Sequence, residues 1–337
     1  MPPPSPPSPP PPPPSWVILG SVARVSARED ADLSLALAPP PRASLLTIPP
    51  RLFPDAPTVH NFPAVLAADP SGLLLLHANQ GRATGPLVID RPGQRQFGWR
   101  EFVDGYFVLD AATGSAFAIP EPELVTEKTF LGILTHPGGG GRYVVAELQP
   151  IIGCDYAELL CFASDVGEWV EKKVPDTLPR RWWVPAAVIA HHGRLWWADL
   201  SFGLITCDPF ADAPALAFVP LPPGKALRYN EAAWVLHRYR VVGLSARKLR
   251  FVDMYRNRDR GGALQISEHL FGVDLRARSV VECEVYELVA PERDVVATRF
   301  VHAWELPRAL SSSSGAMDQT EEKLSPASPP SVLKNKG

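Results

Sequence analysis

The chain has 337 residues, a formal net charge of -3 at pH 7, 46% hydrophobic residues and 20% charged residues. This length suits one large domain or two ordinary ones, with enough apolar material for a sizeable core. The small net charge gives no global signature of a protein that binds nucleic acid or an anionic membrane surface. Proline is in excess, at 39 residues, more than twice its average share.

The four cysteines (Cys154, Cys161, Cys207 and Cys283) form no CxxC pair and lie in apolar runs, where a free cysteine behaves as a small hydrophobic residue. A secreted disulfide framework is therefore not expected. The N-terminus lacks the basic segment and apolar core of a signal peptide. The longest apolar run, VPAAVIA, is far short of the ~20 residues that span a bilayer. These features predict a cytoplasmic or nuclear protein without membrane contact.

Both ends of the chain are low in complexity. Residues 1–15, MPPPSPPSPPPPPPS, hold eleven prolines, which favour a solvated polyproline conformation over helix or sheet. They predict a disordered leader or, alternatively, a ligand for a module of the SH3, WW or profilin type. Residues 308–337 are polar, rich in serine and proline and free of aromatic residues, which predicts a disordered tail. One folded domain is expected between them, over residues 16–307.

Between these ends, short segments rich in Val, Leu, Phe, Tyr and Trp alternate with Gly, Pro, Asp and Asn. This composition is typical of strands separated by turns, and no ten-residue window shows clean helical periodicity. The chain is therefore predicted to be all-β, with strands or strand pairs at residues 73–78, 86–90, 106–120, 142–148, 158–174, 188–200, 203–208, 215–222, 239–244, 248–254 and 270–288.

One phrase recurs: an apolar strand ends in an acidic or small polar residue, a few turn residues follow, and a second strand begins, as in YFVLD-AATG-SAFAIP. An aspartate side chain can accept a hydrogen bond from a backbone N–H two residues on, and glycine can take the positive φ of the turn. The anchors Asp110, Asp165, Asp208 and Asp274 are 55, 43 and 66 residues apart. These intervals bracket the roughly 40–50 residues of a four-stranded propeller blade. The predicted fold is a β-propeller-like repeat of antiparallel hairpins or blades.

The segment LWWADLSFGLITCDPF, residues 195–210, looks at first like a site. Alternation along a strand sends Trp196 and Trp197 to opposite faces. Both faces of a propeller blade are packed, so each ring is expected to be buried against a different neighbouring blade. Asp199 then falls at a strand end and Asp208 at a turn. We therefore interpret this segment as a folding signature.

The run LWWADLSFGLITCDPFADAPALAFVPLPPG, together with YFVLDAATGSAFAIP and SWVILGSVARV, resembles the plant protein family called domain of unknown function 1618, which is expanded in cereal grasses. The similarity spans roughly Trp16 to Val285. That family has no established biochemical activity, so the resemblance implies kinship and not a function. The recurring strand–turn–strand pattern also resembles the propeller-type domains that follow F-box motifs in plant ubiquitin-ligase adaptors. Residues 16–60, however, contain no leucine-rich helical F-box pattern.

Motifs for catalysis and metal binding are weak. Residues 137–141, PGGGG, precede the strand RYVVAEL and not a helix, which predicts an interstrand loop instead of a phosphate cradle. His191 and His192 are neighbours on a predicted strand and are expected to face opposite ways, so that they do not share a metal. No GxSxG motif is present, and no cysteine has an electropositive setting. The sequence predicts no catalytic, cofactor-binding or metal-binding residue.

The strongest local charge lies in residues 238–260, RYRVVGLSARKLRFVDMYRNRDR, where eight Lys or Arg stand against two Asp. Basic residues interleaved with aromatic ones suit RNA, a phosphopeptide or an acidic partner, although the overall charge makes nucleic acid the weaker candidate. The alternative is that these cations alternate outward on two strands and are simply solvated. The candidate partner-binding residues are Arg238, Arg240, Arg247, Lys248, Arg250, Arg256, Arg258 and Arg260.

Three functions follow from this reading. The first is a non-catalytic module whose loops bind an unknown protein partner, without a cofactor. The second is a substrate-recognition subunit resembling F-box-associated domains, which works with a separately supplied F-box protein. The third is a propeller-type hydrolase with its site in the central channel.

Overall fold

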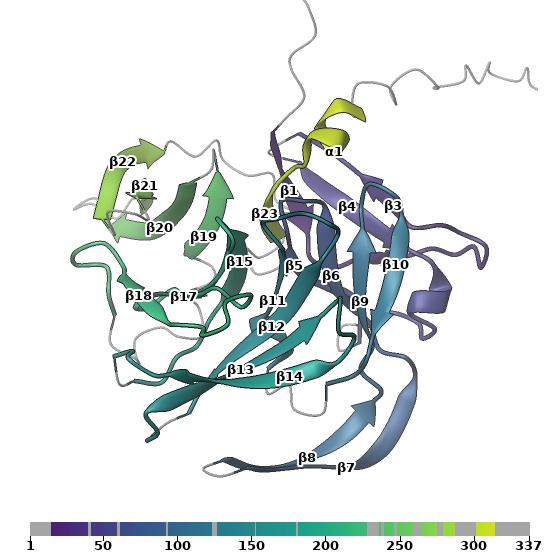
Figure 1. The fold of residues 1–337 in the computed structure, drawn as a ribbon. Coiled ribbons are helices and arrows are strands. Elements are labelled where there is room, and N and C mark those ends of the chain that lie inside the picture. Colours follow the sequence, from purple (N-terminus) through teal and green to yellow (C-terminus); the bar gives the residue numbers. More distant parts are fainter. Residues whose placement is uncertain are drawn as a thin grey trace, which may run out of the picture.

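The computed structural model describes residues 15–313, except for residues 40–41, 59–60, 92–93, 123–126, 152, 180, 228–235, 237–238, 246–247, 259–263, 275–278 and 287–300. The all-β prediction is confirmed. In the part described, strands β1 to β23 are joined by turns, two 3-10 helices, η1 (Pro50–Leu52) and η2 (Lys128–Phe130), and one α-helix, α1 (Arg308–Ser313) (Figure 1). Residues 1–14 and 314–337 lie outside the described residues, so disorder at the two ends stays a prediction.

Five sheets of four or five strands follow one another, and we number them I to V. Sheet I joins the first and last strands of the folded region: β1 pairs antiparallel with β23, with Trp16 opposite Glu305, and parallel with β4. Its strand order is β2-β4-β1-β23, and β3 pairs with β4. Its strands are β1 (Trp16–Gly20), β2 (Arg24–Val25), β3 (Ser34–Ala36), β4 (Ala43–Ile48) and β23 (Val301–Glu305).

Sheets II to V are antiparallel, and each has four strands that are consecutive in the chain apart from one insertion. The insertion is the hairpin of β7 (Arg82–Arg91) and β8 (Gln94–Phe102), which separates β6 from β9 in sheet II. The strands are β5 (Ala64–Ala68), β6 (Leu73–His77), β9 (Tyr106–Asp110) and β10 (Ser115–Ile119) in sheet II; β11 (Leu131–Thr135), β12 (Tyr143–Pro150), β13 (Tyr156–Ala163) and β14 (Trp169–Pro175) in sheet III; β15 (Ala187–His191), β16 (Arg194–Asp199), β17 (Gly203–Cys207) and β18 (Ala217–Pro220) in sheet IV; β19 (Arg240–Ser245), β20 (Lys248–Arg258), β21 (Leu264–Asp274) and β22 (Ser279–Tyr286) in sheet V.

One edge strand of each sheet contacts the corresponding strand of the next sheet. β5 contacts β11, β11 contacts β15, β15 contacts β19, β19 contacts β23, and β23 contacts β5. These strands gather at the middle of the molecule, and the remaining strands of each sheet extend outward from them (Figure 1). The contacts between the five sheets therefore form a closed cycle.

The two adjacent tryptophans explain how neighbouring sheets adhere. Trp197 is fully buried in a cluster shared by sheets III and IV, and its Nε1–H donates to the carbonyl of Phe130 at 2.9 Å. Trp196, 4% exposed, lies in a different cluster, shared by sheets IV and V. The predicted alternation of the two rings is confirmed. An aromatic side chain on each face of β16 therefore adds buried apolar area to the contacts of sheet IV with both neighbours.

The four anchoring aspartates occupy equivalent places in successive sheets. Oδ1 of Asp110 accepts a hydrogen bond from the backbone N–H of Ala112, and Oδ1 of Asp208 accepts one from that of Phe210, both at 2.9 Å. The predicted turn chemistry is thus confirmed at these two positions. All four lie where the third strand of a sheet turns into the fourth: Asp110 in sheet II, Asp165 in sheet III, Asp208 in sheet IV and Asp274 in sheet V.

The sequence places the end of the folded region too early. Arg308–Ser313, assigned to the disordered tail, form α1. Leu310 of this helix is 9% exposed and packs in the cluster shared by sheets I and II. The six residues contain a single large apolar side chain, which is too little for a periodic pattern, and only the packing against sheets I and II identifies them as helical.

Candidate functional site

The basic segment is only partly placed by the structure. Arg238, Arg247 and Arg260 lie outside the described residues, and the side chains of Arg256 and Arg258, on β20, also lie outside them. Lys248 is exposed at the start of β20, and Arg250, two residues on, is half-buried. The described part therefore brings no cluster of exposed cations together, and a basic partner surface stays a prediction.

The expectation that Arg240 is exposed is wrong, because its side chain is not on the surface. It is 6% exposed, and its Nε donates to Oδ1 of Asp253 at 3.0 Å across the β19–β20 pair. Its Nη1 donates to the carbonyls of Leu200 and Lys225. The outward alternation assumed for this strand fails because sheet V packs against sheet IV. Arg240 is thus a structural residue that ties sheet V to the loops of sheet IV.

The hairpin β7–β8 carries the most exposed aromatic side chains in the described part of the chain. Phe97 is 78% exposed, Trp99 67% and Val88 56%. Phe97 lies opposite Val88 and Trp99 opposite Pro86 in the antiparallel register. Residues directly opposite each other, and residues two apart in a strand, share one face. These four residues, which we call the hairpin face, therefore form one continuous apolar surface.

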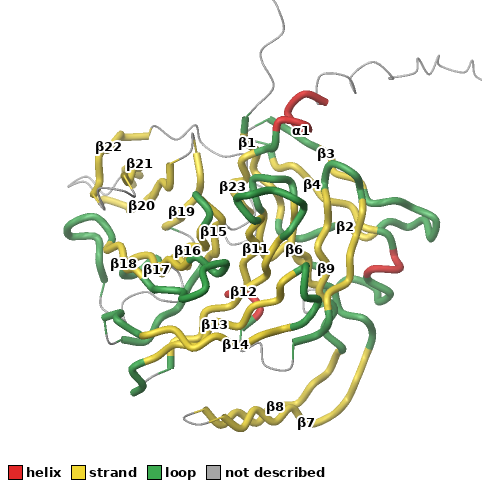
Figure 2. Tube along the Cα trace, in the orientation of Figure 1, coloured by secondary structure: helices red, strands yellow, loops and turns green. Residues whose placement is uncertain are grey.

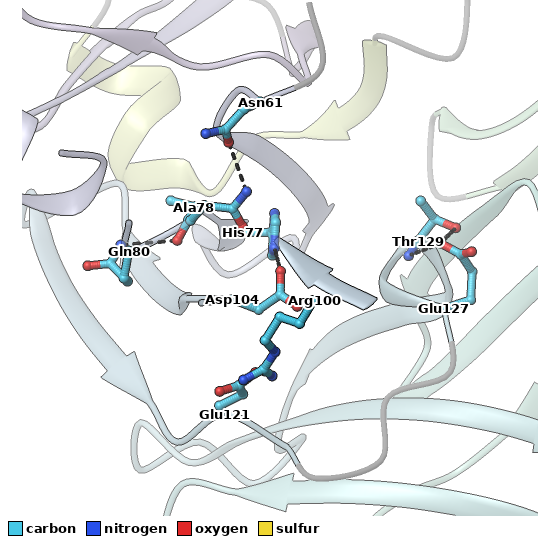
Figure 3. A network of polar contacts seen from close by, with 10 residues as sticks. Asn61, His77, Ala78, Gln80, Arg100, Asp104, Glu121, Glu127 and Thr129 are labelled. Carbon is cyan, nitrogen blue, oxygen red and sulfur yellow. Dashed lines mark hydrogen bonds and ion pairs between the residues drawn. The ribbon is translucent and has the colours of Figure 1, made fainter. Parts of the chain in front are cut away.

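The hairpin extends away from the sheets that carry it (Figures 1 and 2). At its base, the guanidinium of Arg100 on β8 is paired with the carboxylate of Glu121, which follows β10 (Figure 3). This ion pair joins the hairpin to the outer edge of sheet II. The hairpin face is therefore held in place by sheet II while its aromatic side chains stay in solvent.

A cavity of about 610 Å³ lies where the edge strands of the contact cycle begin. Its wall combines residues that precede β5, β11, β15 and β19 with residues at the ends of β6 and β16. Several buried polar side chains line it, and we call it the central cavity. Its polar lining includes Ser21, Asn61, His77, Asn79, Lys128, Thr129, Asp199, Ser201 and His302.

His77 and Asp104 form a short polar contact beside this cavity. Nε2 of His77 lies 2.6 Å from Oδ1 of Asp104 (Figure 3). Burial lowers the pKa of His77 despite the bond to Asp104, and the charge of Lys128 lowers it further. Burial alone would raise the pKa of Asp104, but the hydrogen bond from His77 and the charges of His77, Lys128 and Arg100 hold it below its usual value. A neutral ring that donates Nε2–H to a carboxylate is the resulting state.

Asn61 and Asn79 form a second chain of hydrogen bonds. Nδ2 of Asn61 donates to Oδ2 of Asp55 at 3.2 Å, and Nδ2 of Asn79 donates to Oδ1 of Asn61 at 2.8 Å. A carboxylate only accepts hydrogen bonds, so Asp55 fixes which way the amide of Asn61 points. Asn61 in turn fixes the amide of Asn79. Oδ1 of Asn79 is buried and has no hydrogen-bond partner among the described residues.

Asp199 forms the third polar group of the wall. Its Oδ1 accepts hydrogen bonds from the backbone N–H and the hydroxyl of Ser201, at 2.8 and 2.5 Å. The hydroxyl oxygen of Ser201 accepts one from Nη2 of Arg181 at 2.9 Å. The guanidinium of Arg181 also lies over the ring of Phe202, 4.2 Å from its centroid. These contacts use the carboxylate and the hydroxyl to hold the end of β16.

A smaller cavity of about 310 Å³ lies at the other ends of the same edge strands. It is lined by His191 and His192, whose ring centroids are 4.0 Å apart. The prediction that the two rings face opposite ways is wrong, because His192 is not extended but sits in the β15–β16 turn with a φ of 50°. Burial and the neighbouring His192 lower the pKa of His191 to about 4.

The glycine run lies in a turn, as predicted. Residues 137–141 connect β11 to β12, and Gly139, Gly140 and Gly141 have φ values between 70° and 79°. No group of three or more His, Cys, Asp and Glu side chains within the described ranges is arranged to hold a metal. Among those ranges there is also no helix of the length and hydropathy that a membrane crossing requires.

Sequence reasoning missed both the hairpin face and the central cavity. His77 and Asn79 reach the cavity wall from sheet II, but Lys128, Asp199 and His302 come from segments that lie far away in the chain. The local signal for the cavity was the polar segment HANQ, which follows the buried leucines of β6. For the hairpin, the signal was the pair of aromatic residues in QRQFGWREF, which has too little apolar content for a core strand.

The structure thus defines an all-β protein of five sheets with a polar cavity at their shared edge. A family model described as "Protein of unknown function (DUF1618)" matches residues 197–325, which confirms the family resemblance over that part of the chain. The matched range begins at Trp197, later than the Trp16 inferred from the sequence. No curated protein matches the chain. Among solved structures, a mannose phosphorylase from Leishmania mexicana, MPT-4, is similar at 11% identity, with 79% of this chain and 71% of that chain covered and a TM-score of 0.23.

Proposed function

We propose that this protein is a non-catalytic protein-interaction module with the form of a five-bladed propeller, and that the hairpin face is its contact surface. The observation that carries the proposal is the exposure of Phe97, Trp99 and Val88 on one face of a hairpin that projects from sheet II. Soluble proteins rarely leave such a contiguous apolar surface in water unless it meets a partner.

The propeller form is supported by the cycle of strand contacts from β5 through β11, β15 and β19 to β23 and back. In a propeller, each blade packs face to face on the next, and one blade is completed by strands from both ends of the domain. Sheet I has this composition, since β1 and β23 pair within it. Each remaining sheet is one antiparallel blade of four strands.

The chemistry of the hairpin face suits a protein partner. Tryptophan and other aromatic residues supply most of the binding energy at protein interfaces, because they bury large areas at a low entropic cost. The backbone of β7 and β8 is already paired, so the hairpin is ordered before it meets a partner and little is lost in fixing it. The partner is expected to offer an apolar groove.

Two further proposals come from the sequence. The proline-rich leader is proposed to contact a module of the SH3, WW or profilin type. A reducing compartment, the cytosol or the nucleus, is also proposed. It is supported by Cys154, Cys161 and Cys207, which are free thiols in the structure.

The experiment is affinity purification of the tagged full-length protein from extracts of its source, with bound proteins identified by mass spectrometry. The test variant is Phe97→Ser with Trp99→Ser, and the matched control is Trp182→Ser, an aromatic residue that is 56% exposed elsewhere. We expect proteins retained by the wild type and the control to be lost from the test variant. Equal recovery from all three would contradict the proposal for the hairpin face.

A parallel variant with Arg247, Lys248 and Arg250 changed to Ser separates the hairpin face from the basic segment. Partners lost only from this variant would transfer the contact surface to sheet V. Recovery of ubiquitin-ligase subunits that depend on the hairpin face would make the protein a substrate-recognition subunit. If the wild type retains no protein above the untagged control, the interaction module itself is wrong.

A further inference from the structure

We propose that the hairpin face binds the proline-rich leader, residues 1–14, of a second copy of this chain. The contact rests on the proposed function of the hairpin face and gives that face one particular partner. The hairpin face consists of Pro86, Val88, Phe97 and Trp99. The leader contains eleven prolines and no charged side chain, so an apolar aromatic surface and an uncharged proline-rich segment are present in the same chain.

The exposed rings of the hairpin face suit a polyproline segment. Proline-rich ligands of SH3 and WW modules dock on aromatic side chains, and they lose little conformational freedom because their left-handed helix is formed beforehand. Phe97, 78% exposed, and Trp99, 67% exposed, offer two aromatic rings on one face. The indole N–H of Trp99 donates to no acceptor among the described residues, so it is available to a backbone carbonyl of the leader.

The dimensions of the two segments agree. Phe97 and Trp99 are two residues apart on β8, which corresponds to about 7 Å along an antiparallel strand. A polyproline helix has three residues per turn and rises about 3.1 Å per residue, so its proline rings form rows with apolar grooves between them. Residues 9–14 are an unbroken run of six prolines, about 19 Å long in this conformation. The run is therefore long enough to cover both rings.

The leader of the same chain is badly placed to reach the hairpin face. The backbone N–H of Leu306 donates to the carbonyl of Ser15, which places the start of the folded region beside α1. In Figure 1, α1 and the hairpin β7–β8 lie at opposite ends of the molecule. A folded region of this size is roughly 50 Å across, whereas the leader extends about 43 Å as a polyproline helix. A second copy has no such restriction, because the hairpin projects outward.

Charge disfavours the alternative in which two hairpin faces pack on each other. Residues 82–102 contain four arginines against Asp90 and Glu101. Even with Arg100 paired to Glu121, the hairpin keeps an excess of positive charge. A symmetric contact would bring two such hairpins together, and like charges in an interface repel each other. The leader adds no charged side chain, so it covers the aromatic rings without this cost.

The test is sedimentation velocity of the full-length protein over a wide range of concentration. Two variants each remove one side of the contact. The hairpin variant is Phe97→Ser with Trp99→Ser, and the leader variant is Pro10→Gly with Pro11→Gly and Pro13→Gly. The two variants are also mixed. A synthetic peptide of residues 1–15 serves as a competitor for the wild type.

Each variant has a matched control. Trp182→Ser changes an aromatic residue that is 56% exposed elsewhere, and it controls for the hairpin variant. A tail variant with Pro326, Pro329 and Pro330 changed to Gly removes the same number of prolines from the other end of the chain. It controls for the leader variant.

We expect the wild type and both controls to self-associate as the concentration rises, and to do so weakly, because the interface is small. Association should weaken about tenfold or more in the hairpin variant and in the leader variant. The mixture of these two should associate again, since each supplies the side that the other lacks. The peptide should dissociate the wild-type assembly.

A wild type that stays monomeric at every concentration overturns the leader contact. A leader variant that associates like the wild type also overturns it and would point to a contact between hairpins. Other proteins that bind through the hairpin face in the affinity purification would then preserve the proposed function while the leader contact fails. Should the hairpin variant fail to fold, the leader variant and the peptide decide the question.

Discussion

Trp304 and Asp69 are 235 residues apart in the chain and are joined by a hydrogen bond of 2.9 Å, from the indole N–H to the backbone carbonyl. The carboxylate of the same aspartate accepts hydrogen bonds from the hydroxyl and the backbone N–H of Thr135. Asp69 therefore connects sheet II to sheet I through its backbone and to sheet III through its side chain. Three sheets meet at this one buried residue.

Trp304→Phe should lower the free energy of unfolding by about 1 kcal/mol, because it removes the hydrogen bond and keeps most of the apolar area. Trp304→Ala should lower it by about 3–5 kcal/mol, because it also leaves a cavity. Urea denaturation monitored by circular dichroism measures both values. Equal losses for the two variants would show that the hydrogen bond to Asp69, and not the packing of the ring, carries the effect.

Trp197 and Trp99 offer the same residue type in opposite environments. Trp197→Ala should destabilise the fold by about 3–5 kcal/mol, since the ring is fully buried between sheets III and IV. Trp99→Ala, at 67% exposure, should change stability by no more than about 0.5 kcal/mol. Differential scanning calorimetry of the two variants provides the comparison. A Trp197→Ala protein with an unchanged melting temperature would refute the folding role of the tryptophan pair.

The buried pair of Arg240 and Asp253 should respond asymmetrically to mutation. Arg240→Met leaves the carboxylate with only Lys225, whose Nζ is 3.1 Å away, and should cost about 3–5 kcal/mol. Replacing both partners, with Arg240→Met and Asp253→Leu together, should recover part of this loss, because the buried carboxylate is removed together with its guanidinium partner. A double-mutant cycle by chemical denaturation measures the difference. Additive losses would mean that the two side chains do not interact.

Stability should fall as the pH decreases from 7 to 5. Burial lowers the pKa of His77, His191 and His302, whereas an imidazole in the unfolded chain keeps a pKa of about 6.5. Below about pH 6.5 the unfolded state therefore binds more protons, which favours unfolding. His191→Gln should reduce the slope, since the contribution of His191 is lost between about pH 6.5 and the folded pKa of about 4. Melting temperatures at several pH values provide the test, and an unchanged slope would contradict it.

Two cysteines should resist alkylation in the folded protein. Burial raises the pKa of Cys161 to about 12 and that of Cys207 to about 11, so neither is a thiolate at pH 8. Cys154 is only half-buried and should be modified first of the three. Iodoacetamide labelling followed by peptide mass spectrometry assigns each site. Rapid labelling of Cys161 without denaturant would show that sheet III opens locally.

Local chemistry made the strands and turns predictable from the sequence. The Asp-initiated turns after β9 and β17 use only contacts two residues apart, so a repeat of that phrase already marked the outer half of sheets II and IV. The short strands β5 and β11 escaped prediction because five residues, AVLAA or LGILT, show neither alternation nor length. Their strand form depends on pairing and on contacts with edge strands of other sheets.

The candidate sites were less predictable because they depend on distant residues. His77 stands out as a candidate site residue only because Asp104, beyond the inserted hairpin, is bonded to it and because Lys128 and Asp199 line the same cavity. Arg240 appeared exposed by strand alternation, and only the packing of sheet V on sheet IV places it inside. The sequence pattern describes one strand at a time, whereas a cavity wall requires the order of all five sheets.

The pairing of β1 with β23 sets an order of events during synthesis. The ribosome releases β1 among the first residues of the folded region, but its antiparallel partner emerges only after residues 301–305 have been made. Until then, one edge of β1 presents unpaired N–H and C=O groups, a state that invites pairing with another chain. The nascent protein therefore depends on protection of this edge until β23 has emerged.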